Sequence, residues 1–355
     1  MSLGHESFII LKYGINPIKK INEKGFYKRK TSKNHEYFLQ KPIPIIFGVK
    51  SYKLKKKEKN FFQESNPLGF ILFERNCKNY KQTKLLIKDL KKTTSHKYTM
   101  IMIDQEGGRV ARLKNPNWKS YPSAEYFGIK AKKNLSVAKK LIFKNSIEIA
   151  KDLKKLGINM NCAPVLDVKY DFTNNVIGDR SFSSNPRIVS ELGKSFCNGL
   201  KKIGIIPIVK HIPGHGPSSK DSHKTTPNVD LDLISLNKKD FLPFKKLNKE
   251  PAAMIAHIVY NKIDKDIACC SKEIIKKIIR KKIIAPKVIP PFIRVFLLAK
   301  AKTFAFRSSI FKFFKSIIFY PVLTLTRILK PFRITPPALD FGNFIEDNDA
   351  WPINF

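Results

Sequence analysis

The chain has 355 residues, a length that allows one large domain or two ordinary ones, and 43% of its residues are hydrophobic, which is enough for a core. Its formal net charge of +40 at pH 7 comes mostly from lysines spread along the whole sequence. Dispersed charge is typical of a solvated surface. No zinc-ligand spacing or RNA-binding aromatic pair favours the alternative, a nucleic-acid or anionic-lipid partner.

The cysteines and the first residues indicate the cellular compartment in which the protein is expected. There are five cysteines without paired spacing: Cys77, Cys162, Cys197, Cys269 and Cys270. An odd, unpaired set favours free thiols in a reducing cytosol. The apolar residues 9–11 are too few for a signal peptide, and no run of about eighteen apolar residues predicts a membrane span. We therefore expect a cytoplasmic protein.

Taken in order, the chain begins with a Lys- and Asn-rich segment, residues 1–43, which we expect to be a basic extension without regular structure. Short apolar strands are then predicted at residues 45–49, 69–73, 99–103, 158–163, 205–209 and 252–258. Helices are predicted at 53–64, 80–93, 133–156, 186–203, 234–249 and 271–283. At least six such units predict an α/β fold, a (β/α)8 TIM-type barrel. The alternative, an open doubly wound sheet, lacks its Gly-x-Gly-x-x-Gly turn.

The composition changes after this region. Residues 284–355 form a divergent basic and aromatic tail, and no Asp or Glu occurs between residues 274 and 339. Residues 304–329 could form an amphipathic helix on a membrane surface. The favoured alternative is a tail that was not selected as part of this fold, for example one read in a shifted frame, because acid-free stretches of this length are rare. In that case the last barrel units are incomplete.

The stretch from residue 210 to 223 carries the strongest chemical signal. It reads Lys-His-Ile-Pro-Gly-His-Gly-Pro-Ser-Ser-Lys-Asp-Ser-His and follows a predicted buried strand. Asp221 stands two residues before His223, so a bend can place its carboxylate on one imidazole nitrogen. The other nitrogen is then free to transfer protons near neutral pH. The alternative is a surface loop with incidental histidines.

Three further polar clusters follow predicted strands, at residues 104–112, 164–168 and 175–182. Asp104 can accept hydrogen bonds from sugar hydroxyls, and arginines can bind a carboxylate or carbonyl. Glu106 and Arg109 could instead belong to structural ion pairs. Asp167 is as compatible with a structural role as with a ligand contact. In the third cluster Arg180 is the binding candidate, with Asp179 as its expected structural partner.

Together these motifs closely resemble glycoside hydrolase family 3, specifically the β-N-acetylhexosaminidases of peptidoglycan recycling. The segments that carry the resemblance are Asp-Gln-Glu-Gly-Gly-Arg-Val-x-Arg, Ala-Pro-Val-Leu-Asp-Val, Ile-Gly-x-Arg-Ser-Phe and Lys-His-x-Pro-Gly-His-Gly-x₄-Asp-Ser-His. Residues 66–76 and 254–260 are also similar. The resemblance covers residues 44–283, which we take as the barrel domain.

The resemblance implies a barrel enzyme without metal or cofactor. Its substrate would be a muropeptide or chitooligosaccharide, from which it removes terminal, non-reducing, β-linked N-acetylglucosamine with retention. His223 would be the catalytic acid/base, oriented by Asp221. The residues implied to hold the sugar are Asp104, Arg112, Arg180, Lys210 and His211.

One part of the family pattern is missing. Family members carry the nucleophile in a Ser-Asp-Asp segment after the seventh strand. The corresponding region, near residues 290–300, has no carboxylate. We therefore assign no nucleophile and expect impaired covalent catalysis.

Several alternatives remain open. The chain could be a non-catalytic sugar-binding remnant of the family, or a basic protein that binds nucleic acid or membrane through its tail. A phosphorolytic enzyme is also open, since a histidine acid/base does not repel phosphate as a carboxylate would. A β-glucosidase is disfavoured by the Asp-Ser-His loop.

Overall fold

The computed structural model describes residues 42–114, 116–218 and 227–284, together with the backbone of four short strands at 8–11, 27–29, 37–39 and 294–300. Asp221 and His223 lie outside the described residues, as does most of the tail.

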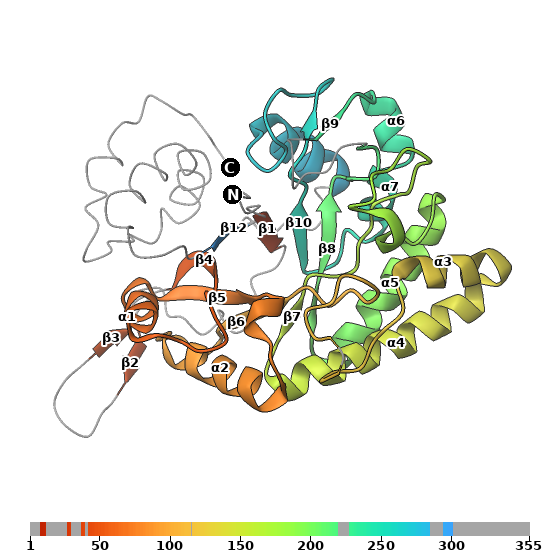
Figure 1. The fold of residues 1–355 in the computed structure, drawn as a ribbon. Coiled ribbons are helices and arrows are strands. Elements are labelled where there is room, and N and C mark those ends of the chain that lie inside the picture. Colours follow the sequence, from red (N-terminus) through yellow and green to blue (C-terminus); the bar gives the residue numbers. More distant parts are fainter. Residues whose placement is uncertain are drawn as a thin grey trace, which may run out of the picture.

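Eight strands close into a barrel, and the helices lie around it (Figure 1). In ring order the strands are β1 (Phe8–Leu11), β10 (Ala252–Ile255), β8 (Ile206–Ile212), β7 (Met160–Asn161), β6 (Met100–Ile103), β5 (Pro67–Leu72), β4 (Ile43–Gly48) and β12 (Arg294–Lys300). All neighbouring pairs from β12 through β4 to β10 are parallel. Strand β1 is antiparallel to both of its neighbours. The predicted α/β barrel is confirmed, with one strand of the ring reversed.

Regular structure also occurs where composition does not predict it. Strands β1, β2 (Tyr27–Arg29) and β3 (Tyr37–Leu39) lie within residues 1–43, and β12 lies within the tail. Strand β1 pairs with β10, far along the chain, and β2 pairs with β3. A local apolar pattern does not reveal β1 and β12, because their pairing depends on partners far along the chain.

Most predicted helices occur close to their expected positions. They are α1 (Lys56–Ser65), α2 (Tyr80–Lys92), α4 (Leu135–Leu156), α5 (Pro186–Ile203) and the π-helix η4 (Ile274–Ile283). The helix expected at 234–249 is divided into α6 (Leu233–Lys238) and α7 (Phe241–Lys246). Pro243 explains the break, because proline has no N–H and its ring would clash with the carbonyl of residue 239 in a continuous helix.

The remaining elements are short. Helix α3 (Ala124–Lys133) is absent from the sequence-based expectation, and it lies between the loop after β6 and α4. Two 3₁₀ turns, η2 (Glu74–Asn76) and η3 (Gly178–Arg180), lie in the loops after β5 and β7. Strands β9 (Asn228–Val229) and β11 (Val259–Tyr260) form a separate parallel pair.

Local sequence signals fix the ends of the two longest helices. The Asn134 side chain accepts a hydrogen bond from the backbone N–H of Val137 and caps α4, and Asn185 caps α5 in the same way. Gly157 and Gly204 end these helices with left-handed backbone, at φ of 91° and 87°. These are the residue types that cap helix termini at low conformational cost.

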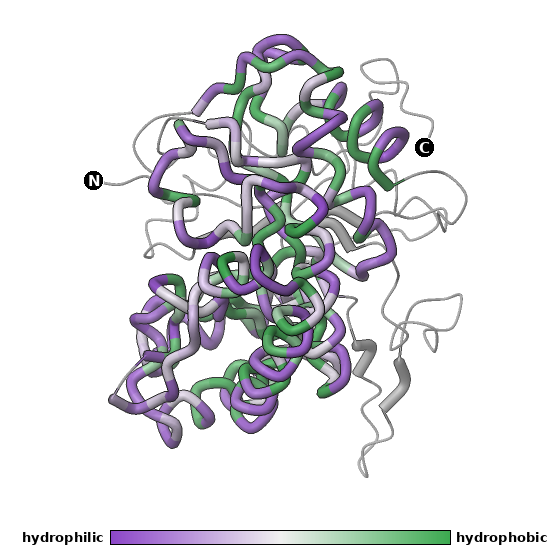
Figure 2. The backbone as a smooth tube through the Cα atoms, turned by 90° about the vertical axis from the view of Figure 1, so that its right-hand side faces the viewer, coloured by the Kyte–Doolittle hydropathy of each residue, from purple (hydrophilic) through white to green (hydrophobic). Residues whose placement is uncertain are grey.

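Two apolar layers hold the barrel together. The interior cluster includes Met100, Met102 and Met254, whereas Ile101 and Ile103 of β6 belong to the layer between the strands and the helices. This alternation is expected because successive strand side chains point to opposite faces. Figure 2 shows hydrophobic segments toward the interior and hydrophilic segments on the outer turns.

Strands β5 and β6 approach each other closely at Gly69. A Cβ atom at this position would lie 2.1 Å from the carbonyl oxygen of Met100. Only glycine fits that spacing without moving one of the strands.

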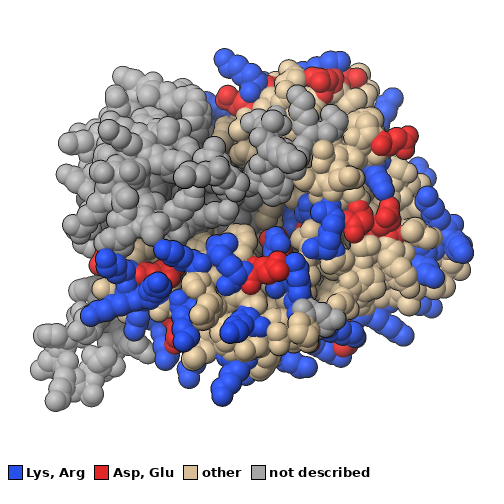
Figure 3. Space-filling model, viewed as in Figure 1, with Lys and Arg blue, Asp and Glu red and all other residues tan. Residues whose placement is uncertain are grey.

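The positive charge is distributed over the described surface. Figure 3 shows lysines and arginines scattered over the face drawn, with acidic side chains between them. The arrangement agrees with a solvated charged surface. Among the described residues, no helix is long and apolar enough to cross a membrane.

Candidate functional site at the carboxyl edge of the barrel

The candidate residues come from three neighbouring parts of the sheet. Asp104 follows the last residue of β6, and Lys210 and His211 lie near the end of β8. Arg112 lies in the loop after β6, and Arg180 ends η3. Because the carboxyl ends of parallel strands meet at one edge of a barrel, the fold brings these five residues to the same face.

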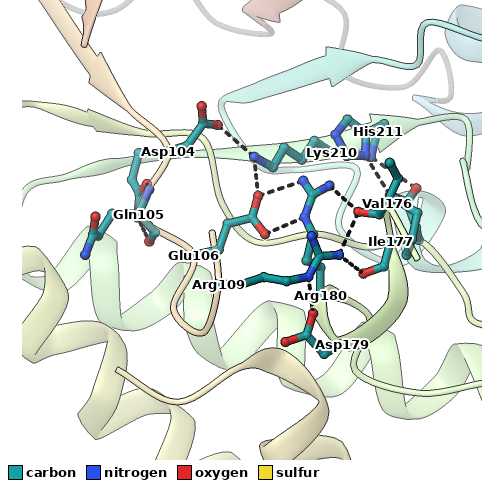
Figure 4. A network of polar contacts seen from close by, with 12 residues as sticks. Asp104, Gln105, Glu106, Arg109, Val176, Ile177, Asp179, Arg180, Lys210 and His211 are labelled. Atoms are coloured by element: carbon teal, nitrogen blue, oxygen red, sulfur yellow. Dashed lines mark hydrogen bonds and ion pairs between the residues drawn. The ribbon is translucent and has the colours of Figure 1, made fainter. Parts of the chain in front are cut away.

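A connected set of ion pairs joins Asp104, Arg112, Arg180 and Lys210 through Glu106, and Figure 4 shows the part around Glu106. The Lys210 Nζ atom lies 2.9 Å from Asp104 Oδ1 and 2.6 Å from Glu106 Oε1. Arg180 donates to both oxygens of Glu106, at 2.8 and 2.9 Å. Arg112 reaches the other oxygen of Asp104 at 3.1 Å. Two carboxylates and three cations therefore leave one positive charge in excess.

Burial strengthens the electrostatic attraction between the charged groups of these ion pairs. The Lys210 side chain is 2% exposed. Burial by itself would raise the pKa of Asp104, but Lys210 and Arg112 hold that pKa well below its usual range. Burial likewise opposes ionisation of Glu106, and Arg180 and Lys210 lower its pKa to about 2. Both carboxyl groups are thus ionised at neutral pH.

Glu106 has a larger role than the sequence indicates. It is the common partner of Lys210 and Arg180, so it joins the loop after β6 to β8 and to η3. Its motif position made a structural pair one of the expected outcomes. The sequence did not reveal that it binds two cations, because both come from distant segments.

The pairing expected for Asp179 is different in the structure. Asp179 accepts a hydrogen bond from Arg109 Nε at 2.6 Å and does not pair with Arg180. Arg109 also donates to the carbonyl oxygens of Val176 at 3.0 Å and Ile177 at 3.3 Å. Arg109 therefore holds the 175–179 turn in place, which leaves Arg180 to Glu106.

A histidine–aspartate pair lies beside this network. His211 Nδ1 is 2.6 Å from Asp167 Oδ2, and the other oxygen accepts the backbone N–H groups of His211 and His215. Asp167 is fully buried, and although burial opposes its ionisation, the neighbouring histidines lower its pKa. The carboxylate thus fixes the His211 ring and leaves Nε2 as the nitrogen available to other groups.

Two amide side chains hold the loop at the carboxyl edge of the barrel in place. The sequence analysis did not identify them. The Gln105 side-chain oxygen accepts the backbone N–H groups of Arg112 and Leu113 at 2.9 and 3.0 Å. Asn161 exchanges two hydrogen bonds with the backbone of Gln105. Both amides are buried, and they fix the loop that carries Arg112 relative to β7.

The beginning of the histidine-rich loop is held against the segment after β7. Thr173 donates to the carbonyl of Gly216 at 2.7 Å, and a Cβ atom on Gly216 would lie 1.8 Å from the Val168 carbonyl oxygen. Nearby, Asp240 is buried and accepts a hydrogen bond from Tyr170 at 2.6 Å. The described part of the loop ends at Ser218, so the Asp221–His223 arrangement stays a prediction.

This arrangement can bind neutral polar groups. An ionised Asp104 and the donors of Arg112 offer adjacent acceptor and donor groups, which is what a sugar hydroxyl requires. Within residues 42–114, 116–218 and 227–284, no group of three or more His, Cys, Asp or Glu is arranged to hold a metal ion.

Comparison with known proteins agrees with this geometry. The family profile of the "Glycosyl hydrolase family 3 N terminal domain" matches residues 39–284. A beta-hexosaminidase of Bordetella avium is 31% identical over 70% of this chain and 71% of its own length. One of Actinobacillus pleuropneumoniae is 32% identical over 66% of this chain and 68% of its own length.

A solved structure is similar as well. NagZ from Neisseria gonorrhoeae, in complex with N-trifluoroacetyl-D-glucosamine, is 32% identical and has a TM-score of 0.65. The match covers 69% of this chain and 72% of that protein. The chain therefore belongs to glycosyl hydrolase family 3, and it is a glycoside hydrolase whose polar network lies at the carboxyl edge of the family's barrel domain.

Proposed function

We propose that this protein is a β-N-acetylhexosaminidase that removes terminal, non-reducing, β-linked N-acetylglucosamine from peptidoglycan fragments. Its relatives include proteins named beta-hexosaminidase, and a similar structure holds an N-acylated glucosamine derivative. A muropeptide or a chitooligosaccharide is the substrate class we propose. All five cysteines are thiols rather than disulfides, which favours a cytoplasmic protein.

The observation that carries the proposal is the fixed position of Asp104. Lys210 and Arg112 bind one oxygen each, at 2.9 and 3.1 Å, and keep the carboxylate ionised at the strand end. A carboxylate has lone pairs beyond those used by the two cations, so it can also accept hydrogen bonds from sugar hydroxyls. Positioned groups of this kind need no reorganisation when the sugar binds.

The other proposed sugar contacts follow from the same network. Arg112 is the most exposed of the three cations, and its guanidinium is available to a hydroxyl or to the N-acetyl carbonyl. Lys210 is nearly covered by its two carboxylates, so we assign it mainly to positioning Asp104. His211 would donate or accept through Nε2, and Arg180 would act beside Glu106.

We propose His223 as the acid/base. A carboxylate-paired imidazole can protonate the leaving oxygen and then accept a proton from the attacking water. Asp221, two residues earlier, would orient the ring. The proposal rests on the sequence motif in this loop.

The nucleophile has no candidate in the sequence region where the family carries it. No carboxylate occurs between residues 274 and 339. Asp104 and Glu106 are held in ion pairs. Because covalent catalysis needs an attacking carboxylate, we expect slow turnover. This observation favours the second candidate function, a sugar-binding protein that does not hydrolyse its ligand.

Hydrolysis of a nitrophenyl β-N-acetylglucosaminide by the full chain, beside His223→Ala, tests the first function. Activity that is lost in the variant supports the hexosaminidase. Titration calorimetry with N-acetylglucosamine, beside Arg112→Met, tests the second. If the chain does not hydrolyse the substrate but binds the sugar saturably, and if Arg112→Met weakens that binding, the result supports the sugar-binding protein. If the full chain shows no turnover and no binding, both candidate functions are refuted.

A further inference from the structure

Two adjacent cysteines and a histidine meet on the turn after β11. Cys269 Sγ lies 4.0 Å from Cys270 Sγ and 3.6 Å from His257 Nδ1. Cys269 is 2% exposed, and Cys270 is half-buried. His257 follows the last residue of β10 by two positions, at the carboxyl end of that strand.

The backbone holds these thiols in place. The N–H of Ala268 donates to the Ile258 carbonyl at 2.8 Å, and the N–H of Cys270 donates to the Ile267 carbonyl at 2.7 Å. Ser271 closes the turn by donating to Asp264 at 2.5 Å. The closeness of the two sulfurs is therefore imposed by the fold.

The other three cysteines, like Cys269, are buried, but none of them is next to a second cysteine in the sequence. Cys77, Cys162 and Cys197 lie among apolar side chains, and burial raises the pKa of each thiol, to about 12 for Cys77. A buried thiol without a neighbouring sulfur and base is chemically inert, because the thiolate is the reactive form. They provide an internal control within the same chain.

We propose that Cys269 and Cys270 form a reversible dithiol–disulfide site for peroxide-class oxidants, with His257 as the proton acceptor. The more exposed Cys270 thiol attacks hydrogen peroxide, which gives a sulfenic acid and one water. The Cys269 proton moves to His257 Nδ1 while Cys269 Sγ attacks Cys270 Sγ. The S–O bond breaks, and the leaving hydroxide takes the proton from His257 as a second water.

Each group suits its step. Exposure favours Cys270 as the first thiol to be oxidised. Burial lowers the pKa of His257, so the ring is neutral at neutral pH and its Nδ1 can accept the Cys269 proton. Two thiols lose two electrons in all, and the peroxide is reduced to two waters.

The product should be easily reduced. Adjacent Cα atoms are only about 3.8 Å apart, less than the roughly 4.4–6.8 Å that disulfides usually span. The ring that closes is therefore strained, and strained disulfides are the labile ones. A mild thiol such as glutathione should restore both cysteines.

The test is peroxide treatment of the folded, full-length protein, followed by alkylation and peptide mass spectrometry. We expect the peptide with Cys269 and Cys270 to lose two hydrogens and to regain them with glutathione. The three buried cysteines should stay reduced. In Cys269→Ser the reaction should stop at a Cys270 sulfenic acid that dimedone traps. Alkylation of both adjacent thiols after peroxide would refute the site.

His257→Asn tests the proton acceptor. A protonated thiol is a poor nucleophile, so a base that takes the Cys269 proton should speed its attack. We expect disulfide closure to slow by roughly tenfold at pH 7 and to recover near pH 9, where the thiol ionises unaided. An unchanged rate at pH 7 would refute the role of His257. The pH dependence of closure in the unmodified chain gives the same test if the variant does not fold.

Discussion

Glu106 is the residue on which the carboxyl edge depends most. Its side chain is 8% exposed and binds both Lys210 and Arg180. Removing one partner of a buried ion pair leaves an uncompensated charge, at a cost of about 3–5 kcal/mol. This cost exceeds the contribution expected of an exposed pair.

We therefore predict that Glu106→Gln lowers the free energy of unfolding by roughly 3–5 kcal/mol in urea titrations. The matched control is Glu125→Gln. Its partner Lys169 lies at a similar distance, 2.7 Å, but both side chains are about 40% exposed. That change should cost less than about 1 kcal/mol. Equal costs for the two variants would contradict the importance of burial here.

Two buried residues near the loop have opposite dependence on pH. Burial raises the pKa of Asp240 from 3.8 to about 7, and burial lowers the pKa of His215 from 6.5 to about 4. Between pH 4 and 6.5 the folded Asp240 retains a proton that the unfolded chain loses, so its contribution to stability falls as pH rises. The folded His215 lacks a proton that the unfolded chain binds, so its contribution rises over the same interval.

We predict that the opposite contributions of Asp240 and His215 to the pH dependence of stability largely cancel in the unmodified protein. Asp240→Asn should remove the Asp240 contribution and leave that of His215. The His215 shift alone corresponds to roughly 3 kcal/mol, so stability of the variant should rise by about that amount between pH 4 and 6.5. His215→Gln should show the reverse slope. Urea midpoints across this interval measure both. Parallel curves for the two variants would contradict the assignment.

At the scale of elements, β5 and β6 are set by a close contact. Gly69→Ala places a Cβ atom 2.1 Å from the Met100 carbonyl oxygen, so a strand must move. We predict a loss of more than about 3 kcal/mol, comparable with a severely overpacked core. Urea unfolding of Gly69→Ala beside Gly204→Ala tests this.

Gly204 is a suitable control because it has left-handed backbone in more open surroundings. The nearest atom to an added Cβ there would be Lys154 Nζ, at 3.9 Å. Alanine at this position should cost only the conformational strain, about 1–2 kcal/mol. A smaller loss at Gly69 than at Gly204 would contradict the close approach of the strands.

The helices and strands show which parts of the fold could be predicted from the sequence. Local apolar periods predicted α4 and α5, since this signal lies within each helix itself. Strand β1 and helix α3 were not found, because long-range pairing and packing decide them. The same holds for the site. Motifs predict Asp104 and Arg180 as candidates, whereas the Glu106 bridge required knowing which segments meet.

For the whole molecule, the main electrostatic feature is the net charge of +40. Like charges spread over a compact surface repel one another and destabilise the folded state. Sodium chloride at 0.1 M screens the repulsion between exposed charges that lie more than about 10 Å apart. The melting temperature should therefore rise between low and moderate salt.

A gain of about 1 kcal/mol in stability would raise the melting temperature by roughly 1–2 °C. The response should shrink when the lysines are acetylated, because acetylation removes the positive charges. A melting temperature that falls with sodium chloride would contradict dispersed repulsion as the dominant effect.

The reversed strand β1 has a consequence for synthesis on the ribosome. Strand β1 is made first, yet its neighbours in the ring are β10 and β12, which are among the last strands made. Until residue 300 has left the exit tunnel, β4 also lacks its partner β12. The growing chain therefore carries unpaired strand edges for most of its translation, and such edges favour association with other chains. Chaperone capture of the nascent protein should accordingly last until the final strand emerges.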